Sequence, residues 1–429
     1  MSQFRLARIS LILAALGLSA APAFLTSAHA EEKPAAAAAA NTLRPDMLKL
    51  LDGAKVDALV AAKNYDAVMA NIVAAEAMPE PTPFEAYMIS RTRLVLGVNT
   101  NNNDLIIPAL ESLIAGGRLA KKEQVNFIAA VADHYFALPD HVKAIAWFKR
   151  YQAESDSPER VRRKLSRSYY TLKDYPNAMI ELDKLVAEAE AAGVAPELHD
   201  LTLRANVQFT LKDKVAYGQS LETLVKYYPK DEYWADLLHR LPNKPGYRPG
   251  LQLDVYRLQL MAQKAMAAEE YVEMAELALQ GYYSTEAKAA LDAGFANHVL
   301  GTGPDAAKHK QLRDQANKGA ADDVKNSAAD EVKARAGKNG QGMANLGYTF
   351  ATMNQFDKGI DLIEKGIAKG GLKNPGDATL HMGVALVKAG KKDEAIKLFE
   401  TLKGTDGTGD LARYWILFLK APVAAPVAK

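Results

Sequence analysis

The sequence predicts an all-α fold, a solenoid built from antiparallel helix pairs. Apolar residues recur at intervals of three and four along almost the whole chain, and no segment alternates with a period of two. A repeated pattern of small, large, small and large residues is the second observation. It appears as Ala132/Tyr135/Ala144/Phe148 and, 34 residues on, Ser166/Tyr169/Ala178/Leu182, then as Gly347/Phe350/Gly359/Ile363 and, 36 residues on, Gly383/Leu386/Ala395/Phe399.

The positions of the repeated small and large residues indicate how the helices pack. Small residues let two paired helices approach closely, and large residues fill the space between one pair and the next. A period of 34 to 36 residues is typical of tetratricopeptide repeats, which the chain resembles in residues 125–228 and 341–402. The resemblance implies a scaffold that binds other proteins.

The first thirty residues have the pattern of a secretory signal peptide. Arg5 and Arg8 precede an apolar run from Ile9 to Leu18, and Ala28-His29-Ala30 supplies a cleavage site. An uncleaved membrane anchor is the alternative, but the run is shorter than the roughly 20 residues that span a bilayer. We therefore expect residues 1–30 to be removed and the protein to be periplasmic.

Composition limits the partners. Without the signal, the chain has 51 basic and 51 acidic side chains, and this balance argues against nucleic acid and anionic membranes as main partners. Cysteine is absent, which excludes disulfides and thiol chemistry. No segment after the signal is long and apolar enough for membrane insertion.

The elements follow in order. Residues 31–41, with six consecutive alanines, read as a flexible linker. Residues 42–240 read as N-terminal helical repeats, because apolar periodicity is broken only at short turns such as Asn64–Ala67 and Asn99–Asn103. Proline and glycine concentrate in 241–250, which predicts a linker or hinge.

Residues 251–420 read as C-terminal helical repeats, with the clearest pair at 341–402. Residues 305–336 are polar and alanine-rich, and we expect exposed helices of low order there. The segment 411–419 predicts a capping helix with Trp415 packed inward, and 421–429 predicts a flexible tail.

Motifs for catalysis are missing, so the sequence predicts no catalytic residue, no cofactor and no metal site. The histidines of the predicted helices favour groove or partly buried positions over metal ligation; they are His134, His199, His298 and His381. A glycan hydrolase would need two convergent carboxylates in a cleft. The adjacent pairs Glu269/Glu270 and Asp322/Asp323 point in different directions on a helix, which disfavours that class.

One cluster of charge is a candidate binding site. If Ser166 is the small residue of its repeat, four side chains share the face that lines the concave side of such arrays: Arg160, Arg163, Arg167 and Tyr170. Neighbouring guanidinium groups repel unless an acid or an anionic ligand lies among them. A solvated face paired with Glu154, Asp156 and Glu159 is the alternative. The array resembles domains that clamp a peptide's terminal carboxylate, but Leu203 stands where the next repeat would offer an asparagine.

A narrower resemblance rests on Tyr228-Pro229-Lys230-Asp231-Glu232-Tyr233-Trp234, on AKAALDAG from Ala287, and on Lys369-Gly370-Gly371-Leu372 with the later HMGVALVKAGKKDEAIKLF and Ala412-Arg413-Tyr414-Trp415. Over residues 140–419 the chain resembles secreted tetratricopeptide proteins found alongside TonB, ExbB and ExbD systems of proteobacteria. The resemblance implies a periplasmic, non-enzymatic accessory of outer-membrane transport, with TonB-system components as partners. An adaptor for cell-envelope assembly or lipoprotein handling is the alternative.

Overall fold

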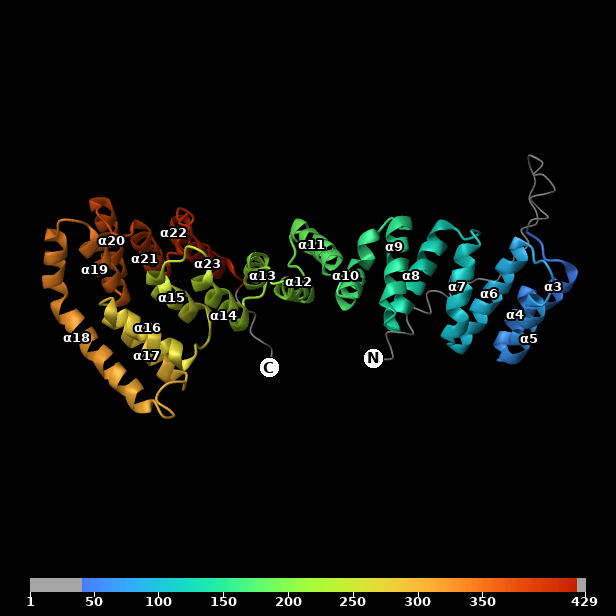
Figure 1. The fold of residues 1–429 in the computed structure, drawn as a ribbon, viewed down its shortest axis with the longest axis horizontal. Coiled ribbons are helices and arrows are strands. Elements are labelled where there is room, and N and C mark those ends of the chain that lie inside the picture. Colours follow the sequence, from blue (N-terminus) through green and yellow to red (C-terminus); the bar gives the residue numbers. More distant parts are fainter. Residues whose placement is uncertain (1–40, 423–429) are drawn as a thin grey trace. The chain divides into compact units, whose positions relative to one another are not determined.

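The computed structural model describes residues 41–422, and within this range every regular element is a helix (Figure 1). Consecutive helices pack side by side in antiparallel pairs joined by short turns. The predicted all-α fold of helix pairs is confirmed. The described part forms two compact units, and the boundary lies between Leu185 and Val186.

The first unit has a core of leucine, isoleucine, valine and phenylalanine side chains between successive pairs. Its elements are α3 (Pro45–Leu51), α4 (Gly53–Ala61), α5 (Tyr65–Glu76), α6 (Pro83–Thr100), α7 (Asn103–Ala115), α8 (Lys121–Ala137), α9 (His141–Glu154), the 3-10 turn η1 (Pro158–Val161), α10 (Arg162–Thr171) and most of α11 (Tyr175–Ala191).

The second unit has a main core that runs from the end of α11 to the last helix, and a smaller separate cluster of Met343, Phe350 and Leu362. Its elements are α12 (Leu198–Thr210), α13 (Lys214–Tyr227), α14 (Asp231–Arg240), η2 (Leu241–Asn243), η3 (Pro249–Leu251), α15 (Gln252–Ala262), α16 (Ala268–Gln280), α17 (Ser284–Ala296), α18 (Ala306–Ala336), α19 (Gln341–Thr352), α20 (Phe356–Lys369), α21 (Pro375–Lys388), α22 (Lys392–Phe399) and α23 (Thr408–Lys420).

The segment 241–250 was predicted to link the regions 42–240 and 251–420. It forms two 3-10 turns inside the second unit, whereas the boundary between units falls within α11. Leu241 and Leu251, at its two ends, are fully buried in the same core. Its proline and glycine residues therefore shape a packed turn and not a hinge between the predicted domains, because the flanking leucines fix both ends.

The repeated columns lie where the paired helices touch. Ala132, Ala144, Ala178 and Ala395 have no exposed surface, and Phe148 and Phe399 are buried beside them. The same spacing recurs in two further pairs, Gly97/Thr100/Ala109/Leu113 on α6 and α7 and Ala275/Ala278/Ala287/Leu291 on α16 and α17, although Thr100 and Ala278 replace the large second residue.

Glycine allows close contact between the backbones of α19 and α20 at these columns. A Cβ atom on Gly347 would lie 2.7 Å from the carbonyl oxygen of Gly359, and one on Gly359 would lie 2.5 Å from that of Gly347. Both distances are shorter than van der Waals contact, so the two backbones touch only because neither residue has a side chain.

Residues 306–336 form one continuous helix, α18, which differs from the expected set of low-order helices. The expected exposure is present, since only Ala316 and Ala320 of this helix are buried. Both alanines belong to the half of α18 that packs on α17. Small residues at this seam hold a polar helix on the unit with little apolar burial.

The predicted signal peptide 1–30 lies outside the described residues, as do nearly all of the predicted linker 31–41 and tail 421–429. These three assignments stay predictions. Within 41–422, no helix combines the length and apolar character that crossing a membrane requires.

Candidate binding sites

The predicted arginine cluster lies at the start of α10, in the first unit. Arg160 belongs to the 3-10 turn η1, which the sequence analysis had merged with the helix, whereas Arg163 and Arg167 lie one turn apart on α10. All three side chains are exposed, and Tyr170 is half-buried. We call this surface the α10 arginine row.

Two further cations of the cluster are held by acids on neighbouring helices. Arg162 lies 3.4 Å from Glu181 of α11, and Lys164 forms an ion pair with Asp133 of α8. The structure therefore separates the cluster into basic side chains that join helices and the exposed row. Arg163 has an interaction of its own, so the row is not uniformly free.

Two of the three acids expected to neutralise the row, Glu154 and Asp156, are engaged elsewhere. Glu154 accepts from Arg150 at 2.7 Å, and Asp156 pairs with Lys121 at 2.6 Å. Among the described residues, no hydrogen bond or ion pair is found for the guanidinium groups of Arg160 and Arg167. This arrangement leaves positive charge at the start of α10 available to a ligand.

Tyr170 contributes packing as well as surface. Its ring lies 5.9 Å from that of Tyr175, measured between centroids, and it contacts the apolar core of the first unit. Leu203, at the position where a carboxylate clamp would offer an asparagine, is buried on α12. At this position the chain therefore has a buried packing residue in place of the asparagine that a carboxylate clamp needs.

A second cluster of charge is buried in the second unit, around Arg257 of α15. Arg257 Nη1 donates to Asp254 Oδ1 at 2.6 Å, and Arg257 Nη2 donates to Glu286 Oε2 at 2.7 Å. Tyr348 Oη donates to Glu286 Oε1 at 2.9 Å, and the guanidinium lies over the Tyr348 ring at 4.3 Å. His381 Nε2 lies 2.8 Å from Arg257 Nη1 and 3.0 Å from Asp254 Oδ1. We call these residues the Arg257 cluster.

This cluster joins four helices, α15, α17, α19 and α21, through side chains that are nearly all inaccessible to solvent. Burial alone would raise the pKa of Asp254, but its contacts with His381 and Arg257 lower that pKa well below its usual range. Burial likewise raises the pKa of Glu286, and the Arg257 charge outweighs it and lowers the pKa. Both carboxyl groups are therefore ionised at neutral pH.

Two convergent buried carboxylates are the arrangement that a hydrolase would need, and here Arg257 lies between them. A general acid needs a raised pKa, whereas Asp254 and Glu286 both have lowered pKa values. The adjacent pair Glu269/Glu270 does not converge either, because Glu270 accepts from Ala267 N while Glu269 is exposed. The cluster is suited to holding helices together and not to acid–base catalysis.

A cavity of about 250 Å³ opens beside the Arg257 cluster. Its walls come from the turn before α15, from α15, from the α16–α17 turn, and from α19 and α21. The polar residues that line it are Gln252, Asp254, Arg257, Tyr283, Gln341, Asn345, Asp377 and His381.

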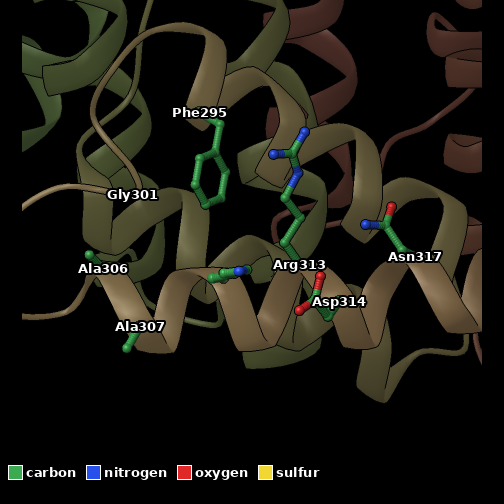
Figure 2. A pocket seen from close by; sticks show the side chains of 8 residues that line it. Phe295, Gly301, Ala306, Ala307, Arg313, Asp314 and Asn317 are labelled. Atoms are coloured by element: carbon green, nitrogen blue, oxygen red, sulfur yellow. The ribbon is translucent and has the colours of Figure 1, made fainter.

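A larger, shallower hollow of about 490 Å³ lies where the loop after α17 meets the first turns of α18. Figure 2 shows the Arg313 side chain rising from α18 beside the Phe295 ring, with a distance of 4.6 Å from guanidinium to ring centroid. Arg313 also pairs with Asp292 at 2.6 Å, so its charge is already neutralised.

The histidines lie apart from one another, and no group of three acidic or histidine side chains within 41–422 is arranged to hold a metal ion. His381 is partly buried, as expected, but it belongs to the Arg257 cluster and not to an empty groove. Sequence reasoning missed this cluster because 124 residues separate Arg257 from His381. One signal was present: Asp254 and Arg257 place opposite charges one turn apart among the apolar residues of α15.

Comparison with known proteins identifies a tetratricopeptide repeat in residues 377–405, which cover most of α21, α22 and the turn after it. No curated protein matches the chain. A similar solved structure is the crystal structure of the P58(IPK) TPR domain at 2.5 Å, with 14% identity, 87% of this chain and 98% of that chain covered, and a TM-score of 0.20. The chain therefore contains a tetratricopeptide repeat, a type of unit that mediates contacts between proteins.

Proposed function

We propose that the protein is a non-enzymatic scaffold that uses the α10 arginine row to bind an acidic segment of a partner protein. This proposal rests on the observation that Arg160 and Arg167 are exposed while Glu154 and Asp156 pair with other cations. The tetratricopeptide repeat supports a protein as partner. Charge-assisted hydrogen bonds to guanidinium groups would give such a segment its affinity.

The site of action that we propose is the periplasm, on the basis of the signal-peptide pattern in residues 1–30. The sequence resemblance supports a TonB-type outer-membrane transport system as the assembly in which the scaffold works. An adaptor for outer-membrane or lipoprotein handling would use the same surface, and identification of the captured partner separates the two.

The first test is crosslinking and recovery of partners from periplasm with the full chain and with Arg163→Ala/Arg167→Ala. The double variant should recover the acidic partner at least tenfold less efficiently, because each lost bond to a charged group is worth about 1.5–3 kcal/mol. Lys55→Ala/Lys122→Ala is the matched control, since it removes the same charge from exposed positions of the same unit. Equal recovery by both double variants would assign the row to a solvated face.

The location is tested separately by cell fractionation and intact mass. We expect the protein in the periplasmic fraction with a mass that lacks residues 1–30. A cytoplasmic protein that retains Met1–Ala30 would contradict this part of the proposal without affecting the scaffold itself.

A further inference from the structure

The cavity beside the Arg257 cluster is lined by two residues whose side-chain oxygens Asp254 Oδ2 and Tyr283 Oη have no hydrogen bond among the described residues. Asp254 is 3% exposed, and the contacts that it makes with Arg257 and His381 both involve Oδ1. Tyr283 is 7% exposed and lines the cavity, and its hydroxyl has no hydrogen-bond partner among the described residues. Neither oxygen is among the fully buried atoms that lack a partner, so both are open to the cavity and available to a donor.

The cationic side chains around the cavity are already paired with carboxylates. Arg257 is bound to Asp254 and Glu286, and Arg248 donates from Nε to Asp406 at 3.1 Å and pairs with Asp377 through Nη2. Four carboxylates lie around three cations and the imidazole of His381. The carboxylates are Asp254, Glu286, Asp377 and Asp406, and the cations are Arg248, Arg257 and Lys388. Of these, the cavity itself is lined by two carboxylates, Asp254 and Asp377, and by one guanidinium, that of Arg257, together with the imidazole.

The walls favour an organic cation over a metal ion. No described group of three acidic or histidine side chains could coordinate a metal, and the Tyr283 ring gives the cavity an aromatic wall. A volume of about 250 Å³ is below the roughly 300–1,000 Å³ of pockets that hold drug-sized ligands. The space therefore suits a single side chain or a small amine.

We infer that this cavity is a second binding site, which takes a guanidinium or ammonium group as donor to Asp254, Asp377 and the Tyr283 hydroxyl. The group comes either from a small free amine or from a lysine or arginine of a partner. The site lies in the second unit and selects positive charge, so it is independent of the α10 arginine row, which selects negative charge.

The test uses the full chain at pH 8 and isothermal titration with four probes: N-acetyl-arginine amide, N-acetyl-lysine amide, N-acetyl-citrulline amide and N-acetyl-glutamate amide. We expect saturable binding of the two cationic probes. Citrulline has nearly the shape of arginine without its charge, so its binding should be at least about tenfold weaker. Equal binding of citrulline and arginine would overturn the inference, and so would an absence of binding by both cationic probes.

Variants test the residues. Tyr283→Phe removes only the hydroxyl, and it should weaken binding of N-acetyl-arginine amide about tenfold. Tyr282→Phe is the matched control, because the neighbouring ring is 83% exposed and is not part of the cavity wall. Asp254→Asn should abolish binding, but it also disturbs Arg257, so the tyrosine pair is the decisive comparison. Identical affinities for Tyr283→Phe, Tyr282→Phe and the unchanged protein would overturn the inference.

One further probe distinguishes the source of the cation. The peptide Gly-Gly-Arg-Gly-Gly carries the guanidinium on a chain that continues in both directions. Binding of this peptide as tightly as the single amide assigns the site to a side chain of a partner protein. Binding of the amide alone assigns it to a small amine, and either result supports the cationic chemistry.

Discussion

The ion pairs of this protein differ in how exposed they are, and therefore in how much each contributes to the free energy of unfolding. Arg257 and its two carboxylates are almost completely buried, whereas Lys365 and Asp361 on α20 are each about half exposed. Desolvation makes a broken buried pair expensive, because the remaining charges have no water to replace the lost partner. Exposed pairs exchange protein contacts for water at little cost.

We therefore expect Arg257→Met to lower the free energy of unfolding by about 3–5 kcal/mol, because it removes the guanidinium that Asp254 and Glu286 share in the core. Lys365→Ala should change it by less than about 1 kcal/mol. Chemical denaturation of both variants measures the difference. Similar losses in the two would mean that the Arg257 cluster is accessible to water.

Glu85 gives a prediction about pH. Its carboxylate accepts from Arg44 Nε at 2.9 Å, from Arg44 Nη2 at 2.8 Å and from Thr82 N at 2.9 Å, and the Arg44 contact lowers the pKa of Glu85 to about 2. Because the folded pKa lies below the unfolded one, this stabilisation is complete above about pH 4.5 and is lost as the pH falls toward 2.

The measurement is acid unfolding of the first unit, followed by hydrogen exchange of α3 and α6. Glu85→Gln should lower stability at neutral pH and should flatten its dependence between about pH 4.5 and 2. Glu80→Gln, a nearby exposed carboxyl, should leave the pH profile as it is. An unchanged slope in Glu85→Gln would show that Glu85 is not the group responsible.

At the scale of helices, the columns of small residues set how closely each pair packs. Ala144 and Ala178 have no exposed surface where α8 meets α9 and α10 meets α11. A leucine at either position would overpack the contact, and we expect a loss of about 1–3 kcal/mol for Ala144→Leu and for Ala178→Leu. Unchanged thermal midpoints in both variants would contradict this register.

Glycine substitutions separate packing from backbone freedom. Gly347→Ala places its Cβ within 2.7 Å of the Gly359 carbonyl oxygen, so α19 and α20 must move apart and stability should fall. Gly218, in the middle of α13, has nothing within 4 Å of such an atom. Gly218→Ala should therefore stabilise the protein by about 0.5–1 kcal/mol, and thermal melts of the two variants should shift in opposite directions.

The helix pairs could be predicted because their contacts are local. Ala132 and Ala144 are buried on the paired helices α8 and α9 only twelve positions apart, and the same spacing recurs in later repeats, so the pattern is visible in the sequence. Contacts that occur once leave no such pattern. Arg257 and His381 touch only after α15 and α21 are placed, which local periodicity does not describe.

The proline and glycine residues of 241–250 predicted a linker or hinge, and the structure differs from that prediction because tertiary contacts again are not visible in local sequence. Their local preference for turns is real, since η2 and η3 are both turns. Their composition does not reveal that Arg248 will pair with Asp377 and Asp406, which lie more than a hundred residues later. A turn and a hinge share the same residues, and tertiary contacts decide between them.

At the scale of the whole chain, the second unit is closed by its last helix. α23 packs on α13 and α15 as well as on its sequence neighbours α21 and α22. Arg413 donates to both oxygens of Glu222 at 2.9 and 2.8 Å, across 191 positions of sequence. As predicted, Trp415 of α23 is packed inward. The same helix also joins the first and last parts of this unit.

This closure predicts that stability of the second unit depends on α23 as a whole. Trp415 is 1% exposed and stacks on Phe399 with centroids 6.0 Å apart, so Trp415→Ala should cost about 3–5 kcal/mol. Native-state hydrogen exchange should show lost protection in α13 and α15 as well as in α22, because α23 contacts all three. Lys420→Ala, at the exposed end of the same helix, is the control. Loss of protection confined to α22 and α23 would mean that α23 is a simple terminal cap, and α13 would then be stable without it.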